Sequence, residues 1–368
     1  MSEVKELKMI VANNCCDFGK KVNNHINQIR HNKIDYIVPT DLVRFNNGEG
    51  KASIKESIRD KDLYILSDVS NYDTYYNYYG RRHYMSPDEH LQDIKRILSA
   101  ECGHAHKRTV VIPYLYQSRQ DKRDSRESLD CARALKELKY MGVNEIITCD
   151  VHNRAVGNAI DMIAFESVRL GDILLYDLLE NEKISDFNKL ICISPDEGAV
   201  KRTRFFSDLI GHAPVAIFCK NRDYTIVENG KNPITDHIYV GPKNLNNMYV
   251  IISDDMIASG GSMIKTVEEI KELGAEKIFV IVTFALFTEG VDKFIKLHEE
   301  GKLDRVYASN VSYVPASVQN MDWFKSVDCS EKIANIISRL NYGESISDLL
   351  DGRTETAIKI KTLRRTYE

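Results

Sequence analysis

The chain alternates short apolar runs with amphipathic helical patterns along most of its length. The apolar runs are Met9–Ala12, Asp35–Pro39, Leu63–Ser67, Thr109–Tyr114, Glu145–Asp150, LICISP, VAIFCK, YVIISDD and IFVIVTFAL. Runs this short and apolar are typical of strands buried on both faces of a parallel sheet. The helical patterns between them include Asp17–Gln28, Asp88–Ser99, Leu129–Tyr140 and Ser262–Leu273. The alternation predicts an α/β fold with mainly parallel sheets flanked by helices.

The length of 368 residues suggests two domains, since roughly 100–200 residues make one. We expect one domain over residues 1–164, a second over 165–327, and a helix and tail over 328–368. Asp88, which follows Pro87, is the N-cap candidate of its helix.

Charge and composition exclude several classes of protein. The net charge is −4, which lacks the basic footprint of a nucleic-acid-binding domain. No apolar run approaches the roughly 20 residues that span a bilayer. The eight cysteines form no CxxC pair, and most lie in apolar surroundings. We therefore expect buried, reduced thiols, no membrane partner and a cytoplasmic location, because no signal-peptide pattern precedes Lys8.

Residues 249–270 form the most specific pattern in the chain. An apolar strand runs into Asp254 and Asp255, and a loop of small residues then leads into a helix. Glycines let the backbone approach a phosphate closely, and the N–H groups at a helix start bind the anion. The paired carboxylates can accept hydrogen bonds from sugar hydroxyls. The arrangement predicts a ribose-phosphate site, and an ordinary strand–helix turn is the alternative.

Two further acids or bases follow predicted strands. Asp196 follows LICISP and precedes a helix rich in basic residues, so it can hold a hydrated Mg²⁺ or simply cap that helix. His152 follows Asp150 just past another strand, where α/β folds bind ligands. A structural role for this histidine is the alternative.

Two segments carry aromatic and basic side chains with polar neighbours. Residues 116–128 are rich in arginine and lysine, which contact triphosphates but also form solvated charge runs. Phe45 and Glu49 bracket a turn. The Phe45 ring can stack on a nucleotide base, and the Glu49 carboxylate can accept a hydrogen bond from that base. A plain surface turn is the alternative. The tyrosine-rich stretch 71–85 is either a stacking surface for a nucleotide or subunit, or an insertion that packs on its own domain.

These segments, in this order, resemble the ribose-phosphate pyrophosphokinase (PRPP synthetase) family. The family segments FSDGE, ARQDR, CDLH, SPDxG, KRR and DDMIDTGGT read here as FNNGE, SRQDK, CDVH, SPDEG, KNR and DDMIASGGS. The likeness runs from about Lys8 to Leu349. It implies two phosphoribosyltransferase-type domains and transfer of the pyrophosphoryl group of Mg-ATP to the 1-hydroxyl of ribose 5-phosphate. AMP would leave, and the protein would be a homo-oligomer, either a hexamer or its dimer or trimer building block.

The resemblance also assigns residues to roles. The ATP site would comprise Phe45, Asn47, Gly48, Glu49, Arg119 and Gln120. His152 and Asp196 would ligate Mg²⁺, and Lys220 and Arg222, at the start of a mobile loop over 220–233, would act at the transition state. Ribose 5-phosphate would be bound by Asp254, Asp255, Ala258, Ser259, Gly260, Gly261 and Ser262.

Three positions depart from the family pattern. Asn47 and Ala258 each stand where the family has an acid, and Asn221 replaces the middle cation of KRR. Asn47 and Ala258 leave open a second function, that of a non-catalytic regulatory homologue that binds nucleotide. The DDMIASGGS loop leaves open a third, that of a phosphoribosyltransferase that consumes PRPP.

Overall fold

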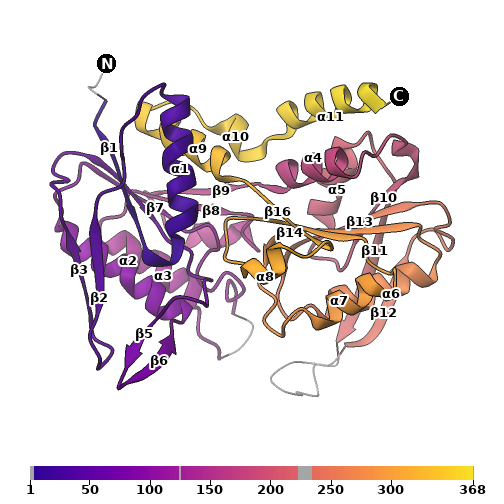
Figure 1. Cartoon of the computed structure of the whole chain (residues 1–368), viewed down its shortest axis with the longest axis horizontal. Coiled ribbons are helices and arrows are strands. Elements are labelled where there is room, and N and C mark those ends of the chain that lie inside the picture. Colours follow the sequence, from indigo (N-terminus) through magenta and orange to yellow (C-terminus); the bar gives the residue numbers. More distant parts are fainter. Residues whose placement is uncertain (1–3, 124–125, 223–233, 368) are drawn as a thin grey trace. The chain divides into compact units, whose positions relative to one another are not determined.

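The computed structural model describes residues 4–123, 126–222 and 234–367, with backbone alone at residues 220–222 and 234–236. Contacts divide the chain into two compact units. Unit 1 comprises Met1–Arg169, Asn310–Tyr313 and Asp328–Asp351, and unit 2 comprises Leu170–Ser309, Val314–Val327 and Gly352–Glu368. Figure 1 labels their elements. The predicted domain boundaries stay a prediction.

Unit 1 is built on a five-stranded parallel sheet in the order β1-β4-β7-β8-β9. The strands are β1 (Leu7–Val11), β4 (Asp62–Leu66), β7 (Lys107–Val111), β8 (Glu145–Cys149) and β9 (Ala164–Val168). The helices of this unit are α1 (Cys16–Ile29), α2 (Pro87–Glu101), α3 (Asp130–Tyr140), α9 (Ser330–Tyr342) and α10 (Ser347–Asp351). Every residue of β4 and β8 is buried, which explains their apolar composition.

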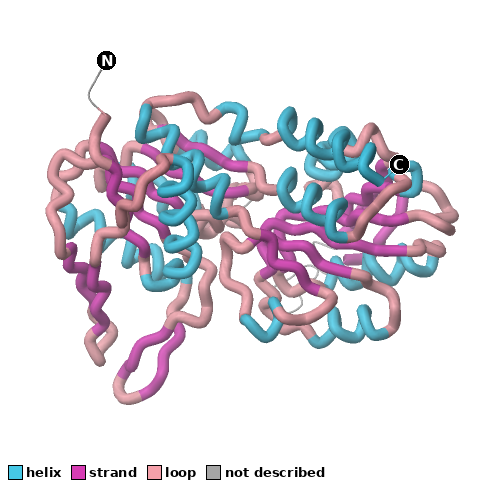
Figure 2. Tube along the Cα trace, turned by 45° about the horizontal axis from the view of Figure 1, so that its top comes forward, coloured by secondary structure: helices cyan, strands magenta, loops and turns pink. Residues whose placement is uncertain are grey.

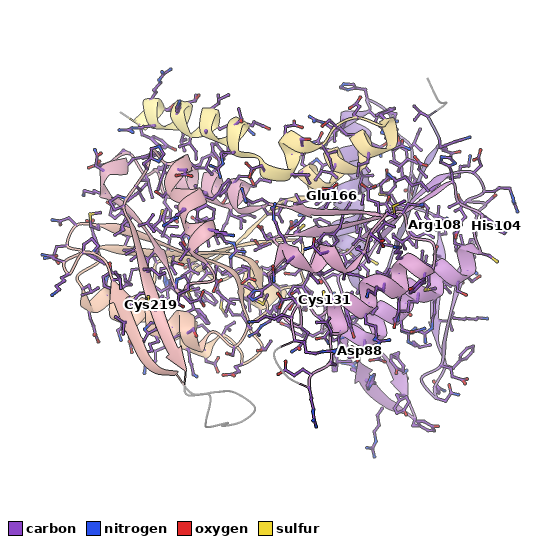
Figure 3. All side chains as sticks on the ribbon, turned by 180° about the vertical axis from the view of Figure 1, so that it is seen from behind. Asp88, His104, Arg108, Cys131, Glu166 and Cys219 are labelled. Atoms are coloured by element: carbon purple, nitrogen blue, oxygen red, sulfur yellow. The ribbon has the colours of Figure 1, made fainter. Side chains whose placement is uncertain are left out.

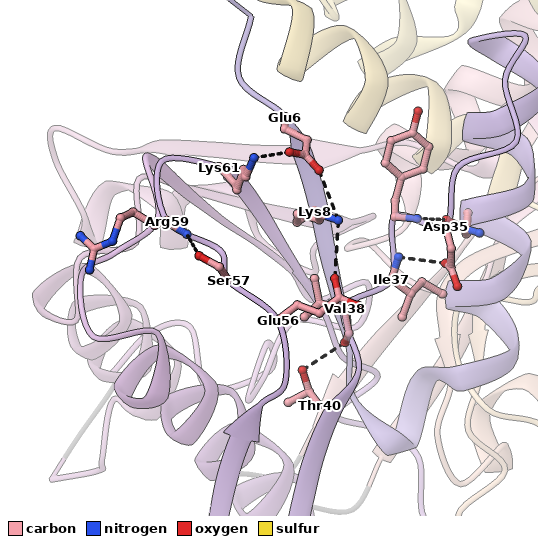
Figure 4. Close-up of polar contacts among 12 residues, drawn as sticks. Glu6, Lys8, Asp35, Ile37, Val38, Thr40, Glu56, Ser57, Arg59 and Lys61 are labelled. Carbon is pink, nitrogen blue, oxygen red and sulfur yellow. Dashed lines mark hydrogen bonds and ion pairs between the residues drawn. The ribbon is translucent and has the colours of Figure 1, made fainter.

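The predicted strand over Asp35–Pro39 is wrong. Ile37 forms only an isolated bridge with Met9. The hydroxyl of Thr40 donates to the Val38 carbonyl (3.1 Å), and the Ile37 N–H donates to the Asp35 carboxylate (3.0 Å; Figure 4). Side chains therefore form hydrogen bonds with backbone groups that would otherwise pair with a neighbouring strand. Pro39 in addition has no N–H to donate.

The predicted N-cap of α2 is also wrong by two residues. Ser86 is the N-cap, and its hydroxyl accepts from the N–H of Glu89. The Glu89 carboxylate accepts in return from the Ser86 N–H (2.9 Å), which completes a capping box. Pro87 is the first helical residue, where its missing N–H costs nothing, so Asp88 lies inside the first turn.

Two antiparallel hairpins project from unit 1 (Figure 2). The first pairs β2 (Thr40–Arg44) with β3 (Gly50–Ile54). The second pairs β5 (Tyr75–Tyr78) with β6 (Arg81–Tyr84) and contains most of the tyrosine-rich stretch. The tyrosine-rich stretch was predicted either to form a stacking surface or to pack on its own domain. Part of it packs on its own domain, because several of its side chains contact α2 and the β2–β3 turn.

Unit 2 is built on a seven-stranded sheet in the order β12-β11-β10-β13-β14-β15-β16, parallel except between β11 and β12. The strands are β10 (Leu190–Ser194), β11 (Val215–Arg222), β12 (Ile234–Val240), β13 (Tyr249–Ile257), β14 (Lys277–Ala285), β15 (Arg305–Ser309) and β16 (Phe324–Val327). The helices are α4 (Gly171–Asn181), α5 (Val200–Leu209), α6 (Gly261–Glu272), α7 (Asp292–Glu299), α8 (Ala316–Gln319) and α11 (Arg353–Tyr367). The predicted α/β class with mainly parallel sheets is confirmed in both units.

All eight cysteines are free thiols. Cys15, Cys131, Cys149, Cys192 and Cys329 are buried, as expected for most of them. Cys16 and Cys102 are exposed, and Cys219 lies half-buried on β11 (Figure 3). Among the described residues, no helix combines the length and apolar character that crossing a bilayer requires.

Candidate active site

In unit 1, predicted site residues follow two neighbouring strands of the sheet. β7 and β8 pair in parallel, so the segments that leave them start at the same edge. Arg119 and Gln120 follow β7 and are exposed, while the buried Leu115 anchors the turn before them. His152 follows β8 and is exposed. The chain thus places an arginine, an amide and a histidine after the carboxyl ends of neighbouring strands of this sheet.

The segment that carries Arg119 is held against α2. The Tyr116 hydroxyl donates to the Asp88 carboxylate at 2.7 Å, and Asp88 lies in the first turn of α2 (Figure 3). The Gln120 N–H donates to the Gln117 carbonyl (2.8 Å), which closes a turn. Gln117 itself has a φ of 52°. This turn directs Arg119 outward while its flanks stay fixed.

The β2–β3 turn contains the other predicted ATP residues. The Gly48 N–H donates to the Phe45 carbonyl (2.8 Å), and Gly48 has a φ of +89°, which favours glycine. The Asn47 amide donates to the Glu49 carboxylate (3.0 Å), and the Glu49 N–H donates back to the Asn47 side chain (3.2 Å). The Phe45 ring is 46% exposed, so an aromatic face and a carboxylate are both available on one turn.

A buried ion pair fixes the end of this hairpin that adjoins the turn. Arg44, at the end of β2, lies 2.6 Å from the Asp93 carboxylate of α2, and both side chains are less than a tenth exposed. Arg96 donates to the same carboxylate oxygen at 2.9 Å. Sequence reasoning missed these residues. The apolar stripe of α2 places Asp93 beside Ile94 and Ile97, but no sequence pattern pairs it with Arg44.

In unit 2, β13 leads through a small-residue loop into α6. Asp254 and Asp255 lie inside β13, which continues to Ile257, rather than at its end as predicted. Gly260 is the N-cap of α6, with a φ of +81° and no side-chain capping bond. A Cβ on Gly260 would lie 2.6 Å from the Phe294 ring, so glycine is required there on two counts.

The start of α6 forms an anion cradle. The N–H groups of Gly261, Ser262 and Met263 have no acceptor within the helix because they belong to its first turn. Gly261 and Ser262 are exposed, and a Cβ on Gly261 would meet no atom within 4 Å. Free N–H groups, the positive end of the helix dipole and open space together suit a phosphate. The Ala258 carbonyl accepts from the Thr288 N–H (2.9 Å), which fixes the other end of the loop.

Carboxylates gather beside this cradle. β10 and β13 are paired neighbours, so Asp196, just after β10, lies near Asp254. Burial and the negative charges of Asp255 and Asp196 raise the pKa of Asp254 well above its usual range. Arg202 of α5 lies 3.7 Å from the Asp254 carboxylate and partly offsets that effect. The Asp196 carboxylate also accepts from the Ala199 N–H (3.2 Å), but Ala199 is the N-cap of α5 and has no side-chain capping bond, so Asp196 does not cap that helix.

The remaining predicted residues, Lys220 and Arg222, border residues 223–233, which the structure does not describe. Lys220 and Arg222 belong to the backbone of β11, where Lys220 pairs with His237 of β12. Their side chains lie outside the described part of the structure, as do residues 223–233 of the predicted mobile loop. The structure therefore brings Asp196 near Asp254, and the roles assigned to the other site residues stay predictions.

Comparisons with known proteins place both halves of the chain in one family. Residues 7–142 match the N-terminal domain of ribose phosphate pyrophosphokinase. Residues 225–351 match the phosphoribosyl synthetase-associated domain. A ribose-phosphate pyrophosphokinase of Haemophilus influenzae is 24% identical over 351 residues, covering 94% of this chain and 99% of that protein.

A second relative and one solved structure agree with this assignment. Ribose-phosphate pyrophosphokinase A of Dictyostelium discoideum is 26% identical over 310 residues, covering 83% of this chain and 88% of that protein. The crystal structure of phosphoribosylpyrophosphate synthetase from Mycobacterium smegmatis has the same fold. It shows a TM-score of 0.74 at 19% identity and covers 92% of this chain and 100% of that one. The chain belongs to the ribose-phosphate pyrophosphokinase family.

Proposed function

We propose that this protein is a ribose-phosphate diphosphokinase that transfers the pyrophosphoryl group of Mg-ATP to the 1-hydroxyl of ribose 5-phosphate. The products would be PRPP and AMP, and the PRPP would serve nucleotide biosynthesis. The observation that carries the proposal is the start of α6, where first-turn N–H groups and open space at Gly261 follow the strand that contains Asp254 and Asp255. A phosphate and sugar hydroxyls are the ligands that match these donors and acceptors.

The ribose 5-phosphate would bind in unit 2. Its phosphate would accept from the backbone between Ala258 and Ser262, and its hydroxyls would donate to Asp254 and Asp255. A sugar hydroxyl gains most from an ionised Asp254, and Arg202 supports that ionised form. The ATP would be held by the residues of unit 1, with adenine against the Phe45 ring and phosphate oxygens at Arg119.

The residues present fit Mg²⁺. Asp196 and Asp254 lie close enough for one charge to shift the other's pKa, and a cation would relieve this repulsion. Mg²⁺ is usually held by one or two carboxylates together with water and phosphates. Asp196 and His152 would hold the ion, which supplies neutralisation of the polyphosphate charge.

The protein's part in the reaction is alignment and charge neutralisation. Phosphoryl transfer needs little covalent help, so placing the 1-hydroxyl in line with the β-phosphorus supplies most of the rate. Lys220 and Arg222 would meet the charge that develops on the leaving oxygen of AMP. The homo-oligomeric state, which rests on the family likeness, and the cytoplasmic location, which rests on the cysteine and signal-peptide patterns, both stay predictions.

The direct test is release of AMP from ATP, Mg²⁺ and ribose 5-phosphate by the purified protein. We expect AMP and PRPP in equal amounts, and we expect Lys220→Ala to reduce turnover by several orders of magnitude without loss of fold. ATP binding without AMP would instead support a regulatory homologue. Pyrophosphate release from PRPP that requires a base would support a phosphoribosyltransferase.

A sharper variant tests the cradle itself. Gly261→Ala adds a methyl group where the folded protein has open space, so the fold should be unchanged. The methyl group would occupy the phosphate position, so KM for ribose 5-phosphate should rise about tenfold or more. The affinity for ATP serves as the internal control and should not change. An unchanged KM for ribose 5-phosphate would remove the cradle from the proposed site.

A further inference from the structure

The β5–β6 hairpin has two faces with different surroundings. Tyr76 and Tyr78 share one face, because side chains alternate along a strand, and Tyr75 lies on the other. The Tyr75 ring packs against two side chains of the same hairpin, the Tyr84 ring (centroids 5.8 Å apart) and the Arg82 guanidinium (4.2 Å from the Tyr75 ring centroid). The Tyr76 and Tyr78 face meets a different element.

That face contacts the β2–β3 turn. A Cβ on Gly48 would lie 3.0 Å from Cε2 of Tyr78 and 3.4 Å from the Tyr76 hydroxyl. The Tyr79 N–H donates to the Asn46 carbonyl at 2.8 Å. The tip of one hairpin thus packs on the tip of the other through a ring and a backbone hydrogen bond.

The same hairpin is anchored to α2. The Tyr76 hydroxyl donates to one oxygen of Glu89 at 2.9 Å, and the His83 ring lies 3.0 Å from the other oxygen. Glu89 is itself fixed as the partner of Ser86 in the α2 capping box. Because the hydrogen bonds to Ser86 and His83 hold the pKa of Glu89 below its usual range, it remains an ionised acceptor at neutral pH.

We propose that the β5–β6 hairpin is a brace that holds the Phe45–Glu49 turn in the conformation that receives the adenine nucleotide, with Tyr78 as its main positioning residue. The inference rests on the proposed function. A two-stranded hairpin alone is marginally stable in water, so the exposed turn at the end of β2–β3 needs external support. A turn that is ordered before binding loses less entropy when ATP arrives, which strengthens binding.

The test compares two tyrosines of the same strand. Tyr78→Ala removes the ring beneath Gly48, whereas Tyr75→Ala removes a similarly exposed ring from the opposite face (41% and 50% exposed). Without nucleotide, Tyr78→Ala should accelerate amide hydrogen exchange in the peptide that spans residues 45–50, and Tyr75→Ala should not. The Kd for ATP should rise about five- to tenfold in Tyr78→Ala alone, with affinity for ribose 5-phosphate unchanged.

Tyr78→Phe should behave like the wild type, because the contact with Gly48 uses ring carbons. The brace is refuted if Tyr78→Ala leaves both exchange and ATP affinity unchanged, or if Tyr75→Ala reproduces its effects. A wild-type protein that binds no ATP overturns the proposed function, and the nucleotide part of this inference with it. The exchange comparison still decides in that case whether Tyr78 holds the turn.

Discussion

Replacing Asp93 by asparagine should weaken the β2–β3 hairpin next to its turn far more than the loss of an ordinary ion pair would. The Arg44 side chain is 6% exposed and would keep its charge without a counter-ion. Removing one partner of a buried pair typically costs about 3–5 kcal/mol. Arg96 is 21% exposed and can turn to solvent, and Arg44 keeps the Tyr76 ring at 5.7 Å. We therefore expect the lower end of that range, about 3 kcal/mol.

The chain offers a matched control on β2, the strand that contains Arg44. Asp41 pairs with Lys55 at 2.5 Å, but these side chains are 55% and 46% exposed. Asp41→Asn makes the same chemical change in a solvated pair and should cost less than about 1 kcal/mol. The double variant Arg44→Met with Asp93→Asn removes both buried charges and should recover most of the lost stability.

Amide hydrogen exchange of peptides from β2 and β3 is the suitable assay. A loss of about 3 kcal/mol corresponds to roughly 100-fold faster exchange where opening is an equilibrium. The single tryptophan, Trp323, is buried in unit 2, and its fluorescence during urea unfolding provides a reference outside the hairpin. If Asp93→Asn accelerates exchange no more than Asp41→Asn does, the buried pair does not hold the turn end of the hairpin.

Three further outcomes are expected. Burial raises the pKa of Asp68 from its ordinary value of 3.8 to about 6, so the folded state holds a proton that the unfolded chain has released. Stability should therefore fall by up to about 3 kcal/mol between about pH 4 and pH 6, and urea titrations of Asp68→Asn should lack this component. Ser86→Ala should lose about 1 kcal/mol in thermal denaturation, whereas Ser99→Ala on the exposed face of α2 should lose none. Ile360→Ala should cost about 2–4 kcal/mol by urea unfolding because the side chain is buried, and Ile358→Ala, 62% exposed on the same helix, should cost little.

A helix or strand was predictable from sequence wherever its own residues formed a recognisable pattern. β4 is buried at every residue, so its apolar run was sufficient. The β5–β6 hairpin was missed because its turn has positive φ at both Tyr79 and Gly80, and only the glycine signals such a turn. Asp35–Pro39 was misassigned because apolar composition does not reveal that side chains occupy its backbone groups.

The sequence predicted which loops contribute to the candidate site, but it did not predict which side chains of different elements interact there. The motif from Asp254 to Ser262 predicts a helix-start cradle from a strand, glycines and a helix, all of which are local. The influence of Asp196 on Asp254 depends on which strands are neighbours. The Arg44–Asp93 pair joins residues of two separate elements, and only the folded chain shows that they meet.

Unit 1 is formed by segments from both ends of the sequence, so it cannot complete its fold until most of the chain has been translated. Helix α1 is translated early, but it packs on α9, and Arg30 just after it donates to Ser338 and Asn341. Asn341 in turn donates to the buried carboxylate of Asp62 at 2.8 Å. The apolar flank of α1 therefore stays without this partner until translation has passed through all of β10 to β16. During synthesis, this first-made surface would be the natural place for a chaperone to bind.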